Sequence, residues 1–308
     1  MRISHGLSPL ASPHAVTIGN FDGLHRGHQA MLDKLAQEAR ARGLPSCVLT
    51  FEPHPREFFA PDQAPARLTS LGEKAALIAA AGIDRLHVLR FDDKLAGLSA
   101  EEFVSGVLVR TLGARHVLVG DDFRFGRGRG GDFALLRRLG LQLGFFSTEA
   151  LATVQVAQRR ASSTAVRQAL AAGNLEQAAE MLGRPYGITG RVVHGDKLGR
   201  GLGFPTANVQ LRHNRPPLWG IFAVEVLGVD HRAWPGAASL GVRPTVHTQG
   251  RATLEVFLLD YRGDLYGRKL RVDFLKKLRD EEKYSDLDSL VAQIRRDVNN
   301  ARHYFDHR

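Results

Sequence analysis

The chain reads AVTIGNFDGLHRGH over residues 15–28, and this stretch decides the fold of its first half. The apolar run Ala15–Ile18 predicts a short buried strand. Residues 29–42 then place their apolar positions on one face, which predicts an amphipathic helix. A glycine-rich turn that carries two histidines therefore joins a strand to a helix.

This turn, residues 19–28, has the chemistry of a phosphate site. The start of a helix offers unpaired backbone N–H groups and the positive end of the helix dipole, and glycines let the backbone approach a ligand closely. His25 and His28 can donate hydrogen bonds to a phosphate whose charge grows during a reaction. The alternative is a tight turn with solvated histidines, because short motifs also match by chance. The pattern favours nucleotide-phosphate chemistry.

Length and composition bound the class of protein. A chain of 308 residues has room for two domains. Residues 1–13 lack the apolar centre of a secretory signal, and no apolar run reaches membrane-spanning length. Cys47 is the one cysteine, so an intrachain disulfide is excluded and a reducing cytoplasm is the expected compartment. Because it lies in an apolar run, we expect a core thiol.

The formal net charge of +10 fits anionic partners, and it equally fits a protein whose charge has no specialised function. Nucleic acid is one class of such partner, and phosphorylated small molecules are another. The basic residues are dispersed apart from 124–129 and 271–279, and neither run has the interleaved aromatic residues of a single-strand binding surface. We therefore expect small substrates, with nucleic-acid binding as the less favoured alternative.

The first half alternates strand and helix patterns, which predicts an α/β domain with a parallel sheet covered by helices on both faces. Ligands bind such sheets beyond the carboxyl ends of the strands. The expected strands are Val16–Ile18, Cys47–Phe51, Leu86–Phe91, Val117–Val119 and Leu143–Phe146, and the expected helices are 29–42, 71–81, 100–112 and 133–139.

The second half changes texture after two short helices, Val166–Ala172 and Leu175–Leu182. Short β-type runs separated by turns predict a small antiparallel barrel, followed by a last helix. We expect domains over residues 1–183 and 184–308. The expected strands are Ile188–Val193, Ile221–Val226, Ala237–Leu240, Thr253–Leu259 and Leu270–Phe274, and the last helix is Leu287–Phe305, with an apolar stripe from Leu287 to Phe305 packed on the barrel.

Three further strings accompany the turn: FEPHP at 51–55, VGDDFRFG at 119–126 and SSTAVR at 162–167. Alone, the second also fits a turn with an exposed ion pair, and the third fits simple helix capping. Together, in order and spacing, these strings resemble the HxGH nucleotidylyltransferase superfamily. The form they resemble is the FMN adenylyltransferase module of bacterial bifunctional riboflavin kinase/FAD synthetases.

The resemblance implies a Rossmann-like domain that transfers AMP from ATP to FMN without a covalent enzyme intermediate. It implies that His25 and His28 hold the ATP phosphates and that Asn20 lies beside the reacting phosphates. Ser163, Thr164 and Arg167 would grip the leaving pyrophosphate. The further implied nucleotide contacts are Gly19, Phe21, Asp22, Gly23 and Gly27, and the implied flavin contacts are His54, Asp121, Asp122 and Phe123.

A second dense string, GRVVHGDKLGRGLGFPTAN, covers residues 190–208. Its glycines suit a loop that closes over phosphates, although a flexible hairpin is the alternative. It lacks the Gly-Lys-Ser/Thr of a Walker A motif. Thr206 and Asn208 add oxygen atoms of the kind that Mg²⁺ accepts beside phosphates.

This string resembles the riboflavin kinase family, whose core is Pro-Thr-Ala-Asn. Matching strings follow in order at 220–224, 241–245, 254–257 and 264–267. The resemblance implies that Thr206 and Asn208 bind the magnesium–nucleotide and that Glu255 is the general base. It also implies nucleotide contacts at Gly195, Lys197, Gly199 and Gly203, and flavin contacts at Arg243 and Arg279.

The two resemblances together imply an enzyme that phosphorylates riboflavin to FMN and then adenylates FMN to FAD, with ATP as the second substrate and Mg²⁺ at both steps. The expected partners are riboflavin, FMN, FAD and ATP; the oligomeric state stays open. Two alternatives remain. In one, only one domain is active; in the other, the scaffold serves an RNA-binding or regulatory protein, as the +10 charge would allow.

Overall fold

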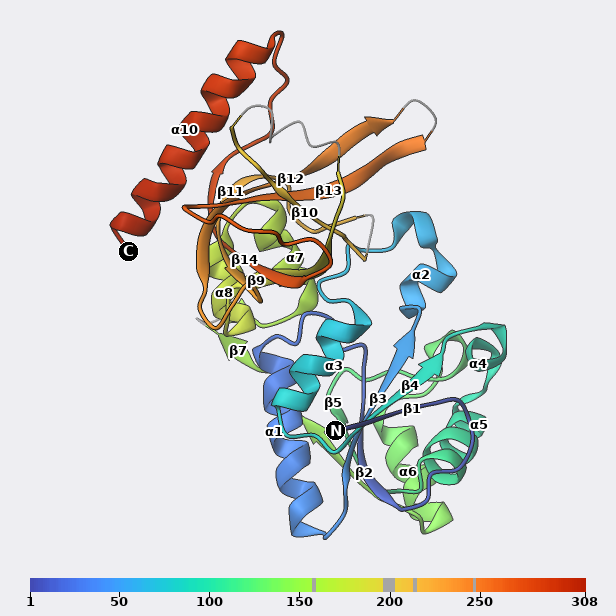
Figure 1. Ribbon diagram of the computed structural model, residues 1–308. Coiled ribbons are helices and arrows are strands. Elements are labelled where there is room, and N and C mark those ends of the chain that lie inside the picture. Colours follow the sequence, from blue (N-terminus) through green and yellow to red (C-terminus); the bar gives the residue numbers. More distant parts are fainter. Residues whose placement is uncertain (157–158, 196–202, 213–214, 246–247) are drawn as a thin grey trace. The chain divides into compact units, whose positions relative to one another are not determined.

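The computed structural model describes residues 1–156, 159–195, 203–212, 215–245 and 248–308. Its contacts divide the chain into two compact units (Figure 1). The first comprises residues 1–65 and 71–162, and the second comprises 66–70 and 163–308. Helices α7 (Ser163–Ala171) and α8 (Leu175–Leu182) thus belong to the second compact unit. The functional boundary expected between residues 183 and 184 stays a prediction.

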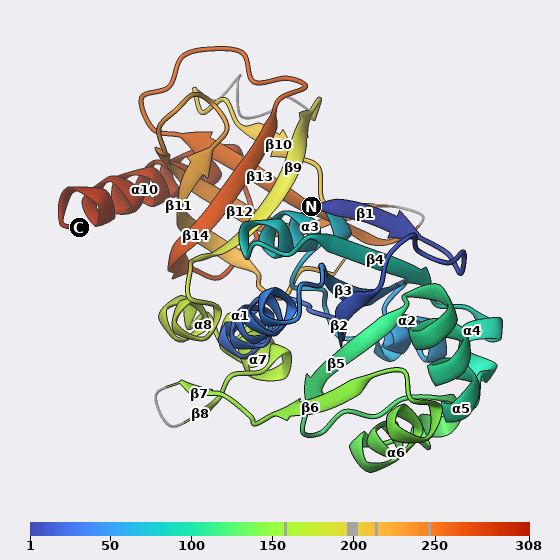
Figure 2. The same cartoon turned by 90° about the horizontal axis from the view of Figure 1, so that it is seen from below.

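The first unit is built on a six-stranded parallel sheet with the strand order β1-β4-β3-β2-β5-β6 (Figure 2). This confirms the predicted parallel α/β architecture. The strands are β1 (Arg2–His5), β2 (His14–Ile18), β3 (Ser46–Glu52), β4 (Arg85–Arg90), β5 (Ala114–Gly120) and β6 (Ser147–Leu151).

Helices cover both faces of this sheet because successive strand residues point to opposite sides. In β3, Val48 joins a core with α1 (Arg26–Ala41) and α3 (Leu71–Ala80). Its neighbours Cys47 and Leu49 join the core on the other face, with the π-helical segment η2 (Phe103–Thr111) and α6 (Phe133–Leu143). Figure 2 shows the two helical layers. Burial raises the pKa of the Cys47 thiol to about 12, which confirms a core thiol.

The sheet order places a topological switch point beside the central strand β2. From β2 the chain adds β3 and β4 on one side, and it later returns to add β5 and β6 on the other. A crevice forms where such connections diverge, at the carboxyl ends of the strands. The glycine-rich turn follows β2 and residues 121–123 follow β5, so both lie at this edge.

Two strand expectations differ from the structure. Leu143–Phe146 is not a strand, because α6 continues to Leu143, Gly144 ends it with a left-handed φ of 64°, and β6 begins at Ser147. Strand β1 was not expected from the sequence; it pairs in parallel with β4 at the sheet edge. The shorter elements of this unit are α2 (Pro55–Phe59), η1 (Pro61–Gln63), α4 (Asp93–Gly97), α5 (Ala100–Glu102), η3 (Arg127–Arg129), β7 (Gln155–Val156) and β8 (Arg159–Arg160).

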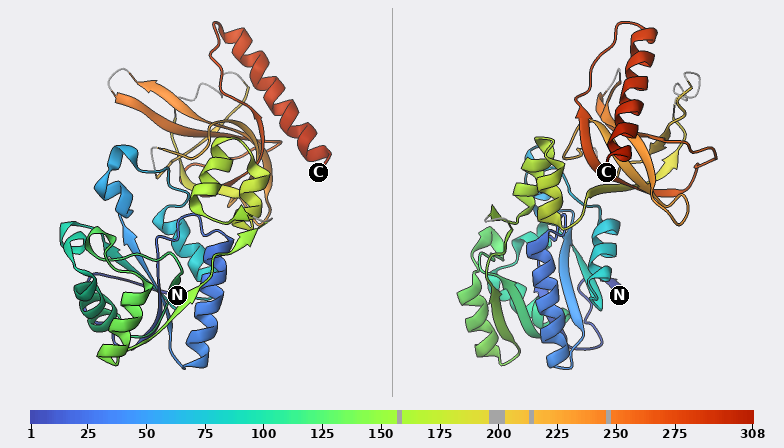
Figure 3. Two further views of the ribbon diagram at one scale, coloured as in Figure 1. Left: turned by 180° about the vertical axis from the view of Figure 1, so that it is seen from behind. Right: turned by 90° about the vertical axis from the view of Figure 1, so that its left-hand side faces the viewer.

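The second unit is a closed antiparallel barrel with the order β10-β13-β12-β11-β14-β9 (Figure 3). It confirms the predicted barrel and adds one short strand, β10, that was not expected. Helices α7 and α8 share its core through residues such as Val166 and Met181. The strands are β9 (Tyr186–Val193), β10 (Ala207–Val209), β11 (Gly220–Leu227), β12 (Trp234–Thr245), β13 (Thr248–Leu258) and β14 (Lys269–Arg279).

The last helix, α10 (Leu287–Asp306), packs on β11, β12 and β14. Ala301 is fully buried against Ala223 and Ala237 of the barrel. Leu287, at the other end, is 59% exposed. The expectation of a stripe packed along the whole helix is therefore wrong for its first turn, which extends past the strands (Figure 3).

Two glycines in the helices of the first unit are expected to respond to alanine in opposite directions. At Gly140 in α6, a Cβ would lie 2.7 Å from the ring of Phe146, so Gly140→Ala should lower the free energy of unfolding by about 1–3 kcal/mol. At Gly72 in α3, a Cβ would meet no described atom within 4 Å apart from its chain neighbours and its own helix backbone, so Gly72→Ala should raise the free energy of unfolding by about 0.5–1 kcal/mol. Denaturant unfolding measures both free energies. The same change in both variants would contradict the close contact at Gly140 and the open space at Gly72.

Candidate active sites

The turn after β2 brings His25 and His28 together. His25 caps α1, and its Nδ1 accepts a hydrogen bond from the backbone N–H of His28 at 3.4 Å. The two imidazole rings stack, with centroids 3.7 Å apart and planes 21° apart. The side chain that begins the helix and the side chain one turn later therefore form one pair at the switch point.

The glycines of this turn make room for the two rings. A Cβ on Gly27 would lie 3.1 Å from Nδ1 of His25, so a larger residue would push the imidazole out of its stack. Gly23 has a φ of 81°, which few other residues adopt. A Cβ on Gly19 would lie 3.1 Å from the ring of Phe21, which is itself buried. The sequence pattern is therefore a packing requirement as well as a phosphate motif.

His28 is held in its neutral form. Burial lowers its pKa well below the usual value, and the positive charges of His25 and Lys74 lower it further. Its Nδ1 and Oδ1 of Asn20 are buried, without a hydrogen-bond partner among the residues that the structure describes. Buried polar atoms are normally paired, so two such atoms at the carboxyl edge of the sheet suit a polar ligand. Asp22 is also buried in this turn.

The loop after β5 is anchored by its two aspartates. Asp121 accepts hydrogen bonds from Thr153, from the backbone N–H at 3.3 Å and from the hydroxyl at 3.2 Å. Asp122 forms an exposed ion pair with Arg160. Phe123 stacks on Phe125 with ring centroids 5.4 Å apart. These contacts give the loop a structural role, and its contact with a flavin stays a prediction.

His54 acts as the N-cap of α2. Its Nδ1 accepts a hydrogen bond from the backbone N–H of Arg56 at 3.1 Å, and the backbone N–H of His54 donates to the carboxylate of Glu57 at 3.3 Å. Next to it, the sequence reasoning missed an aromatic group: the rings of Phe58, Phe59 and Phe91 lie 5.2–5.6 Å apart in edge-to-face contact.

Phe59 in this group is 68% exposed. An exposed ring packed against the half-buried rings of Phe58 and Phe91 offers a flat apolar surface on which a planar ligand can stack. Phe59 stands four residues after Pro55, the last residue of FEPHP, and this closeness was the sequence signal that could have pointed to it.

Ser163, Thr164 and Arg167 lie on α7, which starts at Ser163 and belongs to the second compact unit. Arg167 donates from Nε to the carbonyl oxygen of Ala66 at 2.5 Å. The structure thus groups these three residues on one helix, in a different unit from His25 and His28.

In the barrel, β10 and β13 pair so that Asn208 stands directly opposite Glu255. Side chains at such opposed positions leave the same face of the sheet. Thr206, just before β10, donates from Oγ1 to Oε2 of Glu255 at 3.4 Å. Three residues singled out from two separate strings therefore meet, although 47 residues separate Asn208 from Glu255 in the sequence.

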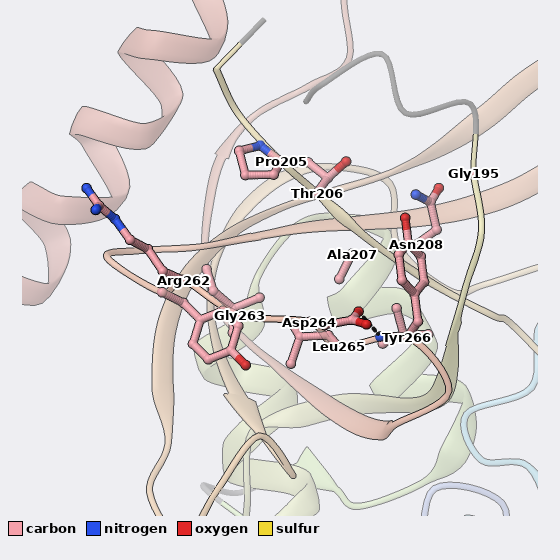
Figure 4. A pocket seen from close by; sticks show the side chains of 13 residues that line it. Gly195, Pro205, Thr206, Ala207, Asn208, Arg262, Gly263, Asp264, Leu265 and Tyr266 are labelled. Carbon is pink, nitrogen blue, oxygen red and sulfur yellow. Dashed lines mark hydrogen bonds between the residues drawn. The ribbon is translucent and has the colours of Figure 1, made fainter. Parts of the chain in front are cut away.

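A cavity of about 280 Å³ opens beside them (Figure 4). Thr206 and Asn208 line one wall, and residues 261–266 line another. The ring of Tyr266 lies 4.0 Å from that of His194. The string Asp264-Leu265-Tyr266-Gly267 resembles the riboflavin kinase family without an implied role, and its first three residues line a wall of this pocket.

Other expected contacts are only partly described. Gly195 lines the pocket, and a Cβ there would overlap the side chain of Asn208. Gly203 is an exposed turn residue with a φ of 85°. Lys197 and Gly199 lie outside the described residues, as does the side chain of Arg243 in β12.

Arg279, expected at the flavin, is paired within the protein. Its Nε and one terminal nitrogen donate to the two carboxylate oxygens of Asp297 in α10, at 2.8 and 2.7 Å. Asp297 is 5% exposed and also accepts from Gln293. The carboxylate of Asp297 raises the pKa of Arg279 above its usual value. The guanidinium fastens α10 to the end of β14, and its contact with a flavin stays a prediction.

Comparison with known proteins gives the class of both units. The family described as FAD synthetase matches residues 8–165, and the family described as riboflavin kinase matches residues 182–305. The chain is 51% identical over 305 residues to a bifunctional riboflavin kinase/FMN adenylyltransferase of Pseudomonas fluorescens, covering 98% of this chain and 97% of the relative. The relative of that name from Escherichia coli K12 is 52% identical over 304 residues, with coverage of 98% and 96%.

The fold is also shared with a solved structure. A protein from Streptococcus pneumoniae described as a macrolide-efflux protein superposes with a TM-score of 0.81 at 28% identity, covering 96% of this chain and 97% of that one. Of the helices in the described part of this chain, none combines the length and the apolar character that crossing a membrane would take.

The family matches make the unit with the stacked histidines a nucleotidyltransferase unit and the barrel with the Thr–Asn–Glu group a kinase unit. This chain belongs to the bifunctional riboflavin kinase/FMN adenylyltransferase family.

Removing Asp297 should be costly, because it would leave the guanidinium of Arg279 without its carboxylate partner. We expect Asp297→Ala to lower the free energy of unfolding of the barrel by about 3 kcal/mol. Denaturant unfolding of the second unit measures this change. Arg302→Ala is the control, because it breaks an exposed pair on the same helix, with Asp260, and should change little. An equal loss of unfolding free energy in Asp297→Ala and Arg302→Ala would show that the buried pair stabilises the barrel no more than the exposed one.

Proposed function

We propose that this chain makes FAD from riboflavin in two ATP-dependent steps, one in each unit. The barrel transfers the γ-phosphoryl group of ATP to riboflavin, giving FMN. The α/β unit then joins FMN to the AMP part of ATP and releases pyrophosphate. The observation that carries this proposal is that each unit holds its own group of reactive side chains: His25 with His28, and Thr206 with Asn208 and Glu255.

In the adenylyl transfer, a phosphate oxygen of FMN attacks the α-phosphorus of ATP, the bond to pyrophosphate breaks, and negative charge accumulates on the phosphates. Neutral His28, the ring of His25 and the N–H groups at the start of α1 stabilise that charge. The side-chain amide of Asn20, which lies at this edge, orients the reacting phosphates by donating from its NH₂ group. Ser163, Thr164 and Arg167 hold the leaving pyrophosphate.

The remaining assignments of this site follow the same edge of the sheet. Gly19, Phe21, Asp22, Gly23 and Gly27 shape the nucleotide side. On the flavin side we assign His54, Asp121, Asp122 and Phe123, and we add Phe59, because its exposed ring can stack on the isoalloxazine.

In the phosphoryl transfer, Glu255 accepts the proton of the ribityl 5′-hydroxyl as its oxygen attacks the γ-phosphorus, and ADP leaves. Thr206 orients this carboxylate through its hydroxyl. The nucleotide occupies the pocket beside Thr206 and Asn208, and we assign Gly195, Lys197, Gly199 and Gly203 as its further contacts. Arg243 and Arg279 complete the flavin side.

Magnesium fits this second site. The Thr206 hydroxyl and the Asn208 amide both line the pocket next to Glu255, and hard oxygen donors beside phosphates are what Mg²⁺ takes. Bound there with the nucleotide, it would neutralise phosphate charge. We place the enzyme in the cytoplasm, in keeping with its single, buried thiol.

A time course of flavins tests the proposal directly. Purified protein is incubated with riboflavin, ATP and Mg²⁺, and the products are separated by chromatography. FMN should appear first and FAD after it. If a folded, flavin-binding protein converts nothing, the proposal is wrong and a regulatory role replaces it.

Substitutions should separate the two activities. His28→Ala should reduce FAD formation from FMN by about 10²–10³-fold and leave FMN formation from riboflavin unchanged, because the groups lie in different units. Glu255→Gln should reduce FMN formation by about 10²–10⁴-fold and leave FAD formation from added FMN unchanged. Each variant is the control for the other, and equal loss of both activities in either one would contradict the assignment.

The kinase unit should also work by itself. A fragment of residues 184–308 is expected to phosphorylate riboflavin and to make no FAD. A fragment of residues 163–308 should have a higher free energy of unfolding, because α7 and α8 contribute Val166, Leu170 and Met181 to the barrel's core. An inactive 184–308 beside an active 163–308 would move the functional boundary to residue 163.

A further inference from the structure

Lys74 is a buried cation on the inner face of α3. The residue is only 4% exposed, and its neighbours Ala75 and Ile78 belong to the apolar core under this helix. Lysine is among the residues least often buried, since removing an ammonium group from water is costly. A lysine kept at such a position indicates a use for its charge.

The ammonium group of Lys74 reaches the carboxyl edge of the sheet. Its Nζ lies 3.5 Å from Oγ1 of Thr50 in β3, two residues before that strand ends. Thr50 in turn donates from Oγ1 to the carbonyl oxygen of Asn20 at 3.4 Å. Asn20 is the second residue after β2, inside the glycine-rich turn. A polar chain therefore runs from α3 through β3 to the turn that carries His25 and His28.

The charge of Lys74 is also felt at His28. Together with His25 it opposes protonation of the His28 imidazole, which burial already disfavours. Inside a protein the field of such a charge is weakly screened, so it acts over several ångströms. The same field stabilises negative charge at the edge where His28 lies.

We propose that Lys74 is a positioning residue of the adenylyl-transfer site, which holds the glycine-rich turn through Thr50 and supplies a fixed positive charge behind the reacting phosphates. The inference rests on the proposed adenylyl transfer and extends it to a residue outside the HxGH string. Lys74 acts through Thr50 and Asn20, and the charge it provides is in place before substrates arrive, so it costs no reorganisation during the reaction.

The test compares Lys74→Met, which keeps an unbranched apolar stem and removes the ammonium group, with Lys74→Arg, which keeps the charge. FAD formation from added FMN is followed over a range of ATP and FMN concentrations. We expect Lys74→Met to lower kcat by about 10–100-fold with smaller changes in KM, and Lys74→Arg to stay within about fivefold of the original protein.

The pH profile supplies a readout that loss of packing would not produce. Without the charge of Lys74, the pKa of His28 rises, so a larger fraction of His28 is protonated on the acid side. The acid limb of the rate profile should then move to higher pH in Lys74→Met and stay in place in Lys74→Arg. Lys34→Met is the matched control, because Lys34 lies on α1 in an ion pair with Glu38 and Glu149; it should leave FAD formation and its pH profile unchanged.

Riboflavin kinase activity of each preparation reports on the barrel, and thermal unfolding reports on the α/β unit. If Lys74→Met fails to fold, Lys74→Gln takes its place. Lys74→Met or Lys74→Gln with kcat within twofold of the original protein overturns the inference, as does an equal loss in the Arg and Met variants with no change of pH profile. If the original protein makes no FAD, the proposed function itself fails, which is a different result.

Discussion

The burial of β2 at the centre of the parallel sheet is the constraint on which the first unit depends. Every residue of this strand is buried, and it pairs with β3 on one side and β5 on the other. Because the connections leave it in opposite directions, a crevice must form at its carboxyl end. The glycine-rich turn directly follows β2 and therefore lies at this crevice. Its histidines stack there because Gly27 leaves room for the ring of His25. The site is thus a consequence of strand order.

The barrel reaches the same kind of result through strand register. Antiparallel pairing of β10 with β13 sets Asn208 opposite Glu255, and a shift by one residue would send one of them to the other face. The pocket beside them is closed by residues 261–266, which connect β13 to β14. The buried pair of Arg279 and Asp297 fastens α10 to the barrel. In both units, regular hydrogen-bonded strands hold the reactive side chains, and loops supply the walls.

Much of this could be predicted from local pattern. The alternation of strand and helix signals in the first half and the antiparallel barrel in the second half are both confirmed. The predictions failed where pairing partners decide the outcome. The edge strand β1 pairs with β4, and the short strand β10 pairs with β13; both partners are distant in the sequence. Leu287 is apolar but exposed, because the first turn of α10 extends past the strands on which it was expected to pack.

By itself, the sequence determined which chemical groups are present: a glycine-rich turn with two histidines, and a Pro-Thr-Ala-Asn string followed by a glutamate. Those depend on local residue types and spacing. Only the tertiary structure decided that Asn208 and Thr206 meet Glu255 and that Lys74 reaches Thr50. It also decided that Arg279 pairs with Asp297 and that α7 packs with the barrel. The physical reason is that these contacts join residues far apart in the chain, and burial and strand pairing select them only once the whole unit has folded.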